Sequence, residues 1–210
     1  MAETKGLCIE VLVEEPSAEE ALRHILPKLI CGRSHYKIIN LGSKSKLLRK
    51  LNQRLSAYRD RIKNGENLRV VVLVDGDDDD CQTLKKQLET TANQSGLYTK
   101  SSPDHYGQFV VLNRIVIKEL ESWFIGDSEA LCKAFSSLPS ISTKSGIFRS
   151  PDNDGSWEAL HRFLKKYGIY KSSYPKIDAA RRIAPHMNPD QNRSPSFNCF
   201  KTGLEAILSQ

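Results

Sequence analysis

The chain opens with apolar runs of the kind that form buried strands. Residues 7–13 (LCIEVLV) and 68–74 (LRVVVLV) are nearly continuous and rich in β-branched side chains. Such runs are typical of parallel strands that are covered on both faces. Shorter runs at residues 36–41 and 108–112 predict two further strands.

Helical periodicity fills the segments between these runs. Apolar residues recur at helical spacing through residues 21–29 and 47–62, and a polar helix is predicted over residues 83–93. Strand and helix thus alternate three times along the first half of the chain. This alternation predicts an α/β, Rossmann-like fold with a mostly parallel sheet flanked by helices.

Three local signals mark expected helix ends. Ser17, followed three residues later by Glu20, fits a capping box at the start of the first helix. Pro27 is expected to kink that helix or end it early. Ser196 is the expected N-cap of the last helix.

The second half of the chain differs in composition. Residues 136–155 are rich in Ser, Pro, Gly, Asn and Asp, which predicts a loop and the best candidate for a boundary. Helices are expected beyond it over residues 157–167, 178–186 and 196–208. The expected organisation is an α/β domain over residues 1–135, the loop over 136–155, and a C-terminal helical extension over 156–210 packed on the same domain.

Composition narrows the class of protein. The 210 residues are 39% hydrophobic and 27% charged, which is enough apolar chain for a core. No apolar run approaches the roughly 18 residues of a spanning helix, so we expect no membrane segment. The five cysteines form no C-x-x-C pair and no secretion signal is visible, which favours reduced thiols and a cytoplasmic location. Histidine and cysteine spacings suited to zinc are missing, so oxygen ligands are expected for any metal.

The net charge of +6 conceals a segregation of charge. Residues 43–63 contain eight basic side chains and one acidic residue, whereas residues 75–80 contain five aspartates. Acid in one loop and base spread over a surface suit a protein that holds a hard cation and contacts a polyanion. A solvated helix beside a solvated turn is the alternative.

The sharpest local motif is Asp75-x-Asp77, which directly follows the third predicted strand. Two carboxylates two residues apart in a turn can face one site, and hard oxygen ligands of this kind suit Mg²⁺ or Mn²⁺. The motif is not an EF-hand loop, because its sixth position is Asp80 rather than Gly and its twelfth is Lys86 rather than Glu. An exposed acidic turn is the alternative interpretation.

Glu14 and Glu15 follow the first predicted strand. Carboxyl ends of parallel strands lie at one edge of an open sheet, so these acids are expected beside Asp75 and Asp77. The sequence leaves open which of Glu14 and Glu15 points inward. Glu19, one helical turn further on, could bind metal or orient a water as a general base, although the helix dipole alone also favours an acid there.

Residues 114–127 combine acids with large apolar groups and predict a short strand or turn that runs into a helix. Glu119 and Glu121 lie in this segment, where a buried carboxylate without a partner would be costly. A metal ion, or a partner such as Arg114 or Lys118, would offset that cost. A structural salt bridge is favoured over a second metal position.

Basic and aromatic residues are interleaved in the last third of the chain. The pattern suits phosphate contacts and base stacking, although a solvated basic helix face is the commoner explanation. The candidate nucleic-acid-binding residues are Lys171, Arg181, Arg182 and Arg193.

The two acidic motifs, Glu15-Pro-Ser-Ala-Glu19 and Val74-Asp-Gly-Asp77, resemble those of the TOPRIM domains of topoisomerases, primases and overcoming-lysogenization-defect (OLD) nucleases. In those domains a glutamate after the first strand and a D-x-D pair after the third hold Mg²⁺. Over nearly its full length the chain is also similar to an uncharacterised bacterial TOPRIM-like family. The shared stretches are residues 13–20, 75–81, 119–127, 183–186 and 192–197.

The resemblance implies a TOPRIM-like fold and a nuclease domain that depends on Mg²⁺ or Mn²⁺. In it, Glu15 is the TOPRIM glutamate, Asp75 and Asp77 are the D-x-D pair, and Glu19 is the downstream acid of the nuclease branch. Such domains are often encoded beside an AAA-type or ABC-type ATPase in loci thought to serve phage defence, which implies DNA or RNA and such an ATPase as partners. Pro16 stands where a glycine usually follows the glutamate, so a stiff turn replaces a tight one.

The leading hypothesis is therefore a metal-dependent phosphodiesterase that acts on DNA or RNA. The residues expected to hold metal are Glu15, Asp75 and Asp77. Those expected to activate water or hold a second ion are Glu19, Glu119 and Glu121. A catalytically silent module that binds nucleic acid or an ATPase is the alternative. A phosphatase of the haloacid dehalogenase type is disfavoured, because that type usually has Thr or Val where this chain has Asp79.

Overall fold

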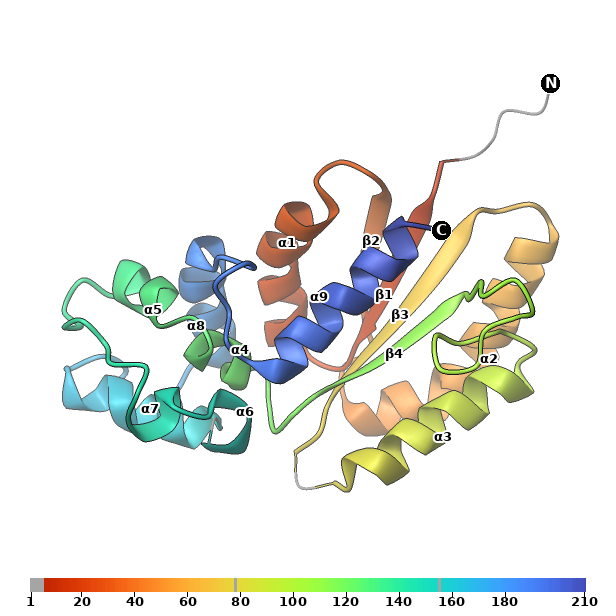
Figure 1. Ribbon diagram of the computed structural model, residues 1–210. Coiled ribbons are helices and arrows are strands. Elements are labelled where there is room, and N and C mark those ends of the chain that lie inside the picture. Colours follow the sequence, from red (N-terminus) through yellow and green to blue (C-terminus); the bar gives the residue numbers. More distant parts are fainter. Residues whose placement is uncertain (1–5, 78, 155) are drawn as a thin grey trace.

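A four-stranded sheet runs through the centre of the computed structural model, which describes residues 6–77, 79–154 and 156–210 (Figure 1). Its strands are β1 (Cys8–Val13), β2 (His35–Asn40), β3 (Leu68–Asp75) and β4 (Val111–Val116). They lie in the order β2-β1-β3-β4, and every neighbouring pair is parallel. The predicted α/β, Rossmann-like fold with a parallel sheet flanked by helices is confirmed.

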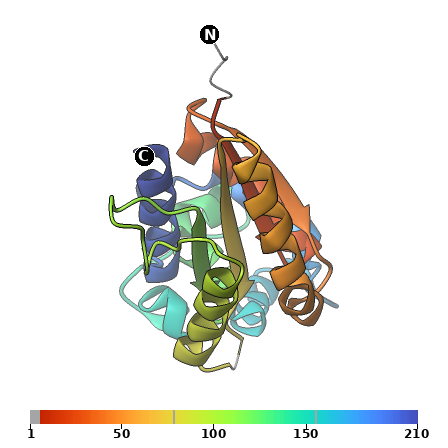
Figure 2. The ribbon, with the colours of Figure 1, turned by 90° about the vertical axis from the view of Figure 1, so that its right-hand side faces the viewer.

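Helices cover both faces of the sheet (Figures 1 and 2). α1 (Pro16–Ile30) connects β1 to β2 on one face, and α2 (Lys44–Lys63) and α3 (Cys81–Gln94) cover the other. The strand order therefore reverses between β1, which Glu14 follows, and β3, which ends at Asp75. Open parallel sheets bind ligands at such a reversal, outside the carboxyl ends of the strands.

The two central strands, β1 and β3, are buried because an apolar layer packs on each side of them. In β3, Val70 and Val72 face α2 and α3, whereas Val71 and Leu73 face α1 and the C-terminal helices. This two-sided burial explains why the sequence of β3 is apolar without alternation.

The C-terminal part of the chain is helical and packs against the sheet (Figure 1). Its helices are α4 (Glu121–Ile125), α5 (Ser128–Ala134), α6 (Pro151–Asp154), α7 (Trp157–Lys166), α8 (Lys176–Ile183) and α9 (Pro195–Leu208). α9 lies against β4 and α1, and α8 lies against α1. The segment predicted as a loop contains α6 and a 3₁₀ turn at residues 146–148.

Two expectations from composition bear on the structure. Within the ranges that the structure describes, no helix has the length and apolar character needed to cross a membrane. The five cysteines are all unpaired.

The prediction for β4 is wrong in position. The strand spans Val111–Val116, whereas residues 108–112 were expected, because two polar residues obscure the apolar pattern. Asn113 is buried and donates to Glu89 at 3.1 Å. Arg114 donates to the backbone oxygen of Cys199 in α9 at 2.9 Å. Tertiary partners thus make these polar residues acceptable inside a strand.

The predicted helix-end signals are also wrong in detail. Ser17 does not cap α1; it lies in the first turn, and its hydroxyl donates to Glu15. Pro27 lies within α1, which continues to Ile30 because Leu29 and Ile30 are buried in the core. Ser194 rather than Ser196 caps α9, accepting a hydrogen bond from the Phe197 amide at 3.1 Å.

A buried polar network joins α4, α6 and the start of α9. Asp152 accepts hydrogen bonds from the Ser194 hydroxyl and, at 2.7 Å, from the Ser196 amide. The Trp123 indole donates to the Ser196 hydroxyl at 3.1 Å, and the Asn192 amide donates to the Trp123 carbonyl at 2.8 Å. The network therefore holds α4 in a fixed position beside the sheet.

Gly126, at the end of α4, is required by this close packing. A Cβ atom there would collide with the Asn192 side-chain oxygen and lie 2.8 Å from the Ser194 amide nitrogen. We expect Gly126→Ala to lower the free energy of unfolding by at least about 2 kcal/mol, because the buried network must shift. Gly6→Ala is the matched control, since a Cβ there meets nothing within 4 Å. Equal midpoints of urea unfolding for both variants would contradict this account.

Candidate active site

Acidic side chains from three segments meet at the reversal between β1 and β3. They come from the end of β1, the end of β3 and the start of α4. We call the following set the acidic cluster: Glu14, Glu15, Asp75, Asp77, Glu119 and Glu121. The sequence prediction named every member except Glu14 as a site residue.

Glu14 is the inward-pointing acid of the pair after β1. It is 8% exposed, and its carboxylate accepts a hydrogen bond from the backbone amide of Asp75 at 2.5 Å. Burial raises its pKa to about 7. Glu15 is more exposed, and its carboxylate accepts a hydrogen bond from Ser17 and lies 3.9 Å from the ammonium group of Lys176. The open choice between the two acids is therefore resolved by position: Glu14 faces β3, and Glu15 faces the rim.

Asp75 is the most central carboxyl group of the acidic cluster. It is buried at the end of β3, and burial raises its pKa well above the usual value. The charges of Glu14, Glu15 and Glu121 raise this pKa further. Such coupling requires short separations, so residues from β1, β3 and α4 share one electrostatic environment.

Glu121 is the least expected feature of the site. It begins α4 and is 1% exposed, and within the part of the chain that the structure describes neither of its carboxylate oxygens has a hydrogen-bond partner. Burial raises its pKa to about 7, against the opposing effect of Lys176. Burial raises the pKa of the Tyr174 phenol well above its usual value, and the charge of the neighbouring Glu121 raises it further. Unpaired buried carboxylates are costly, which marks Glu121 as a functional candidate.

Two lysines stand among the acids, and sequence reasoning assigned neither of them to the site. Lys44, at the start of α2, lies 2.6 Å from Asp77 and 2.9 Å from Asp79. Lys176, at the start of α8, lies 3.1 Å from Glu119. A salt bridge for Glu119 was predicted, but its partner comes from α8, whereas Arg114 points to α9. No local signal could identify these lysines, because each reaches the site only through the packing of its helix.

The loop after β3 is shaped by pairing with the segment that leaves β4. The amides of Gly76 and Asp77 donate to the carbonyls of Val116 and Lys118 at 2.7 and 2.8 Å. Asp77 has a φ of 49°, a left-handed conformation that Asp tolerates better than most residues. Asp80 caps α3 by accepting from the Thr83 amide at 3.1 Å. Asp78 lies outside the described residues.

Glu19 is held away from the acidic cluster. Its carboxylate pairs with Arg23 at 2.6 Å and accepts a hydrogen bond from Asn40 at 3.3 Å. The hydrogen bond from Arg23 is the main reason that its pKa is lowered. The structure thus gives Glu19 partners on α1 and β2, whereas Glu121 is close enough to Asp75 for its charge to raise the pKa of that group.

The acidic cluster offers suitable donor atoms for a hard divalent cation, but not a formed coordination shell. Carboxylate oxygens are the ligands that Mg²⁺ and Mn²⁺ prefer, and those of Glu121 accept no hydrogen bond from the described part of the chain. Among residues 6–77, 79–154 and 156–210, no group of three or more Asp, Glu, His or Cys side chains is arranged to hold a metal. Ammonium groups of Lys44 and Lys176 supply positive charge there instead.

The predicted nucleic-acid-binding residues are mostly engaged in the fold. Arg181 pairs with Glu20 at 3.0 Å. The guanidinium of Arg182 lies 4.3 Å from the Phe135 ring centroid. Arg193 donates to the carbonyls of residues 143 and 148 at 3.0 and 3.1 Å. Of the four, Lys171 is exposed without such a contact in the described part of the chain.

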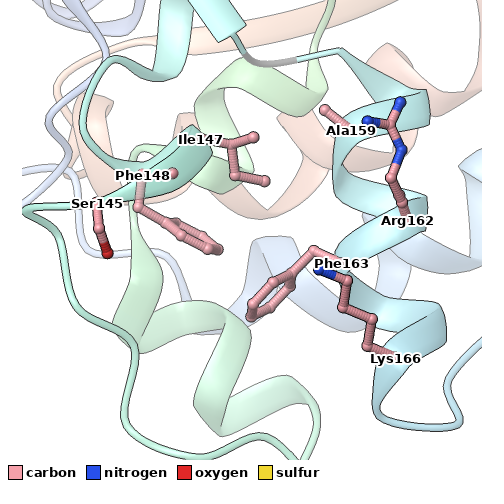
Figure 3. Close-up of a pocket in the computed structure, with 8 residues that line it drawn as sticks. Ser145, Ile147, Phe148, Ala159, Arg162, Phe163 and Lys166 are labelled. Carbon is pink, nitrogen blue, oxygen red and sulfur yellow. The ribbon is translucent and has the colours of Figure 1, made fainter.

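A separate cavity of about 280 Å³ lies between the 3₁₀ turn at residues 146–148 and α7 (Figure 3). Phe148 and Phe163 approach each other across it, and Arg162 and Lys166 project from α7 beside it. Its described lining contains no carboxylate, so it is distinct from the acidic cluster.

Comparison with known proteins identifies one family. The model of the family described as a domain of unknown function (DUF4276) matches residues 13–205. No curated protein and no solved structure matches the chain. The matched range contains the whole acidic cluster and both lysines.

The raised pKa of Glu121 makes stability depend on pH. Because this pKa rises from 4.5 to about 7 on folding, the folded protein holds a proton in that window that the unfolded chain has released. The free energy of unfolding therefore falls as pH rises from about 4.5 to about 7. We expect Glu121→Gln to reduce this fall by up to about 3 kcal/mol, measured by urea unfolding with chelator at pH 5 and pH 7.5. Glu129→Gln, at an exposed site on α5, is the control; if Glu121→Gln shows the wild-type pH dependence, the assignment is wrong.

Proposed function

Since the chain belongs to the DUF4276 family, whose description assigns no activity, we propose its function from the acidic cluster: it is a metal-dependent phosphodiesterase that cleaves DNA or RNA. The observation that carries the proposal is Glu121, a buried carboxylate beside Asp75 at the strand-order reversal, whose two oxygens have no hydrogen-bond partner among the described residues. A fold gains nothing from such a group alone. A divalent cation would offset its cost.

The donor groups divide into a buried pair and an exposed rim. Asp75 and Glu121 lie inside, while Glu15 and Asp77 lie toward solvent. These four carboxylates would hold Mg²⁺ or Mn²⁺. When bound, the cation polarises a phosphodiester and lowers the pKa of a water molecule.

The chain's own lysines complete the proposed site. Lys176 is 31% exposed at the rim, and its ammonium is shared between Glu119 and Glu15. A phosphate oxygen arriving there would find a cation already positioned. Glu119 also accepts a hydrogen bond from the Trp157 amide at 2.9 Å, so its role is to orient Lys176 rather than to act on water.

The resemblance to TOPRIM domains supports the same reaction. Glu15, Asp75 and Asp77 carry that resemblance, and they lie at one edge of a parallel sheet. We extend the proposal on this basis to a role in phage defence beside an AAA-type or ABC-type ATPase.

A second candidate, a catalytically silent module that binds nucleic acid or an ATPase, is favoured by a different observation. Within the described ranges no metal-holding group of three side chains is formed, and Lys44 already pairs with both Asp77 and Asp79. In such a module the lysines would be permanent substitutes for the cation. The two candidates therefore differ in whether a divalent ion binds.

Cleavage assays test the first candidate. We expect Asp75→Asn and Glu121→Gln each to lower Mn²⁺- or Mg²⁺-dependent cleavage of single-stranded and duplex DNA and RNA by at least about 100-fold, because each replaces a charged carboxylate ligand with a neutral amide. Glu121→Gln removes an unfavourable charge, so its loss of activity is expected without loss of stability. Glu129→Gln is the control and should keep wild-type activity. Unchanged cleavage by both site variants would refute the assignment.

Metal binding separates the two candidates directly. Isothermal titration of the full chain with Mn²⁺ is expected to show a saturable site that Asp75→Asn weakens at least about tenfold. Wild-type protein that takes up no Mn²⁺ would favour the silent module.

A further inference from the structure

α2 carries the most one-sided charge of any helix in the described part of the chain. Its 20 residues include eight basic side chains and one acidic residue, Asp60. Leu47, Leu51 and Leu55 on its inner side are buried against the sheet. The basic residues therefore occupy the sides and the outer face of an amphipathic helix.

Half of these eight basic residues interact with other groups of the fold: Lys44, Arg59 and Arg61 form ion pairs, and Arg54 hydrogen-bonds to the Tyr58 side chain. Lys44 pairs with Asp77 and Asp79, and Arg61 pairs with Glu10 and Glu66. Arg59 pairs with Asp60 on the same helix at 2.9 Å, which also consumes the one acid of α2.

The other four basic residues of α2 are exposed to solvent and have no ion-pair partner among the described residues. They are Lys46, Arg49, Lys50 and Lys63. Lys46 and Lys50 lie one helical turn apart, with Arg49 beside them. Unpaired like charges on adjacent turns repel each other, so folding alone does not favour them.

The neighbouring helix extends the same sign of charge. α3 packs beside α2 on this face of the sheet (Figure 1). Its acid, Glu89, is paired with Lys85 at 2.7 Å, while Lys86 is exposed. The layer formed by α2 and α3 thus presents a positive surface to solvent.

The positive surface leads to the acidic cluster. α2 begins at Lys44, whose ammonium contacts the loop after β3, and its length of 20 residues corresponds to about 30 Å. Lys46, Arg49 and Lys50 lie in its first two turns, nearest to that loop. A polyanion lying along these turns would reach the rim formed by Glu15 and Asp77.

We propose that a nucleic-acid backbone binds along the outer face of α2, through Lys46, Arg49 and Lys50, and not on the C-terminal cations. This inference rests on the proposed function for the nature of the polyanion, and it names the surface that positions it. Phosphate contacts made by exposed lysine and arginine suit this geometry, because they need charge rather than a shaped pocket. Three of the four C-terminal candidates are engaged elsewhere, as shown above for Arg181, Arg182 and Arg193.

The test measures binding without catalysis. Fluorescence anisotropy with 20-nucleotide single-stranded and duplex oligonucleotides, in EDTA and over 50–200 mM KCl, gives the slope of log K against log salt concentration. We expect the double variant Lys46→Gln/Lys50→Gln to make this negative slope shallower by about 2, because two phosphate contacts are lost. Gln matches Lys in helix propensity, and both positions are exposed, so thermal unfolding should be unchanged.

The matched control is Lys165→Gln with Lys171→Gln, which removes the same charge from exposed positions in the C-terminal part. It should retain the wild-type slope. A reversed pattern would overturn the proposal and move the backbone to the C-terminal surface. Wild-type protein that binds polyglutamate but no oligonucleotide would overturn it in favour of an acidic protein partner.

The outcomes also separate this inference from the proposed function. If the α2 variant binds as wild type while Asp75→Asn abolishes cleavage, the proposed binding surface is wrong and the proposed phosphodiesterase activity is supported. If the α2 variant loses binding but wild-type protein cleaves nothing, the surface stands and the activity is wrong.

Discussion

The burial of carboxyl groups at the strand-order reversal is the constraint on which the rest of this structure depends. Glu14, Asp75 and Glu121 all lie largely out of water, and burial raises the pKa of each. Glu14 is compensated by a backbone amide, whereas the oxygens of Glu121 have no hydrogen-bond partner among the described residues. Proteins tolerate such unfavourable groups chiefly where chemistry requires them, because uncompensated burial weakens the fold.

The hydrophobic pattern of the sequence predicted the architecture because the two central strands, β1 and β3, are apolar along nearly their whole length, as buried strands are. The apolar run of β3 ends at Asp75, so the position of the D-x-D turn at a sheet edge followed from parallel topology alone. The pairing of Lys176 with Glu119 could not be predicted, since it joins positions 57 residues apart and depends on how α8 packs on α1. β4 was misplaced for a related reason: Asn113 and Arg114 look unsuitable for a strand until Glu89 and α9 supply their partners.

The stretches that carry the family resemblance serve two different purposes. Those around Glu15 and Asp75 place carboxylates at the sheet edge. Residues 119–127 and 192–197 instead form a buried network through Trp123 and its neighbours. That network fixes α4, and α4 in turn presents Glu121. Two of the stretches that carry the resemblance, residues 119–127 and 192–197, therefore serve mainly to position one acid, Glu121.

Lys28 joins α1 to the segment that directly follows α8. From α1, its ammonium donates to the carbonyls of Ala184, Pro185 and Met187 at 3.3, 2.6 and 2.7 Å, directly after α8 ends. Glu15 precedes α1 and Lys176 begins α8. The two helices are therefore joined at their N-terminal ends by the Glu15–Lys176 contact and at their C-terminal ends by the hydrogen bonds of Lys28. Contacts at both ends of the two helices therefore fix how α1 and α8 lie against each other, and this packing sets the separation of Glu15 and Lys176.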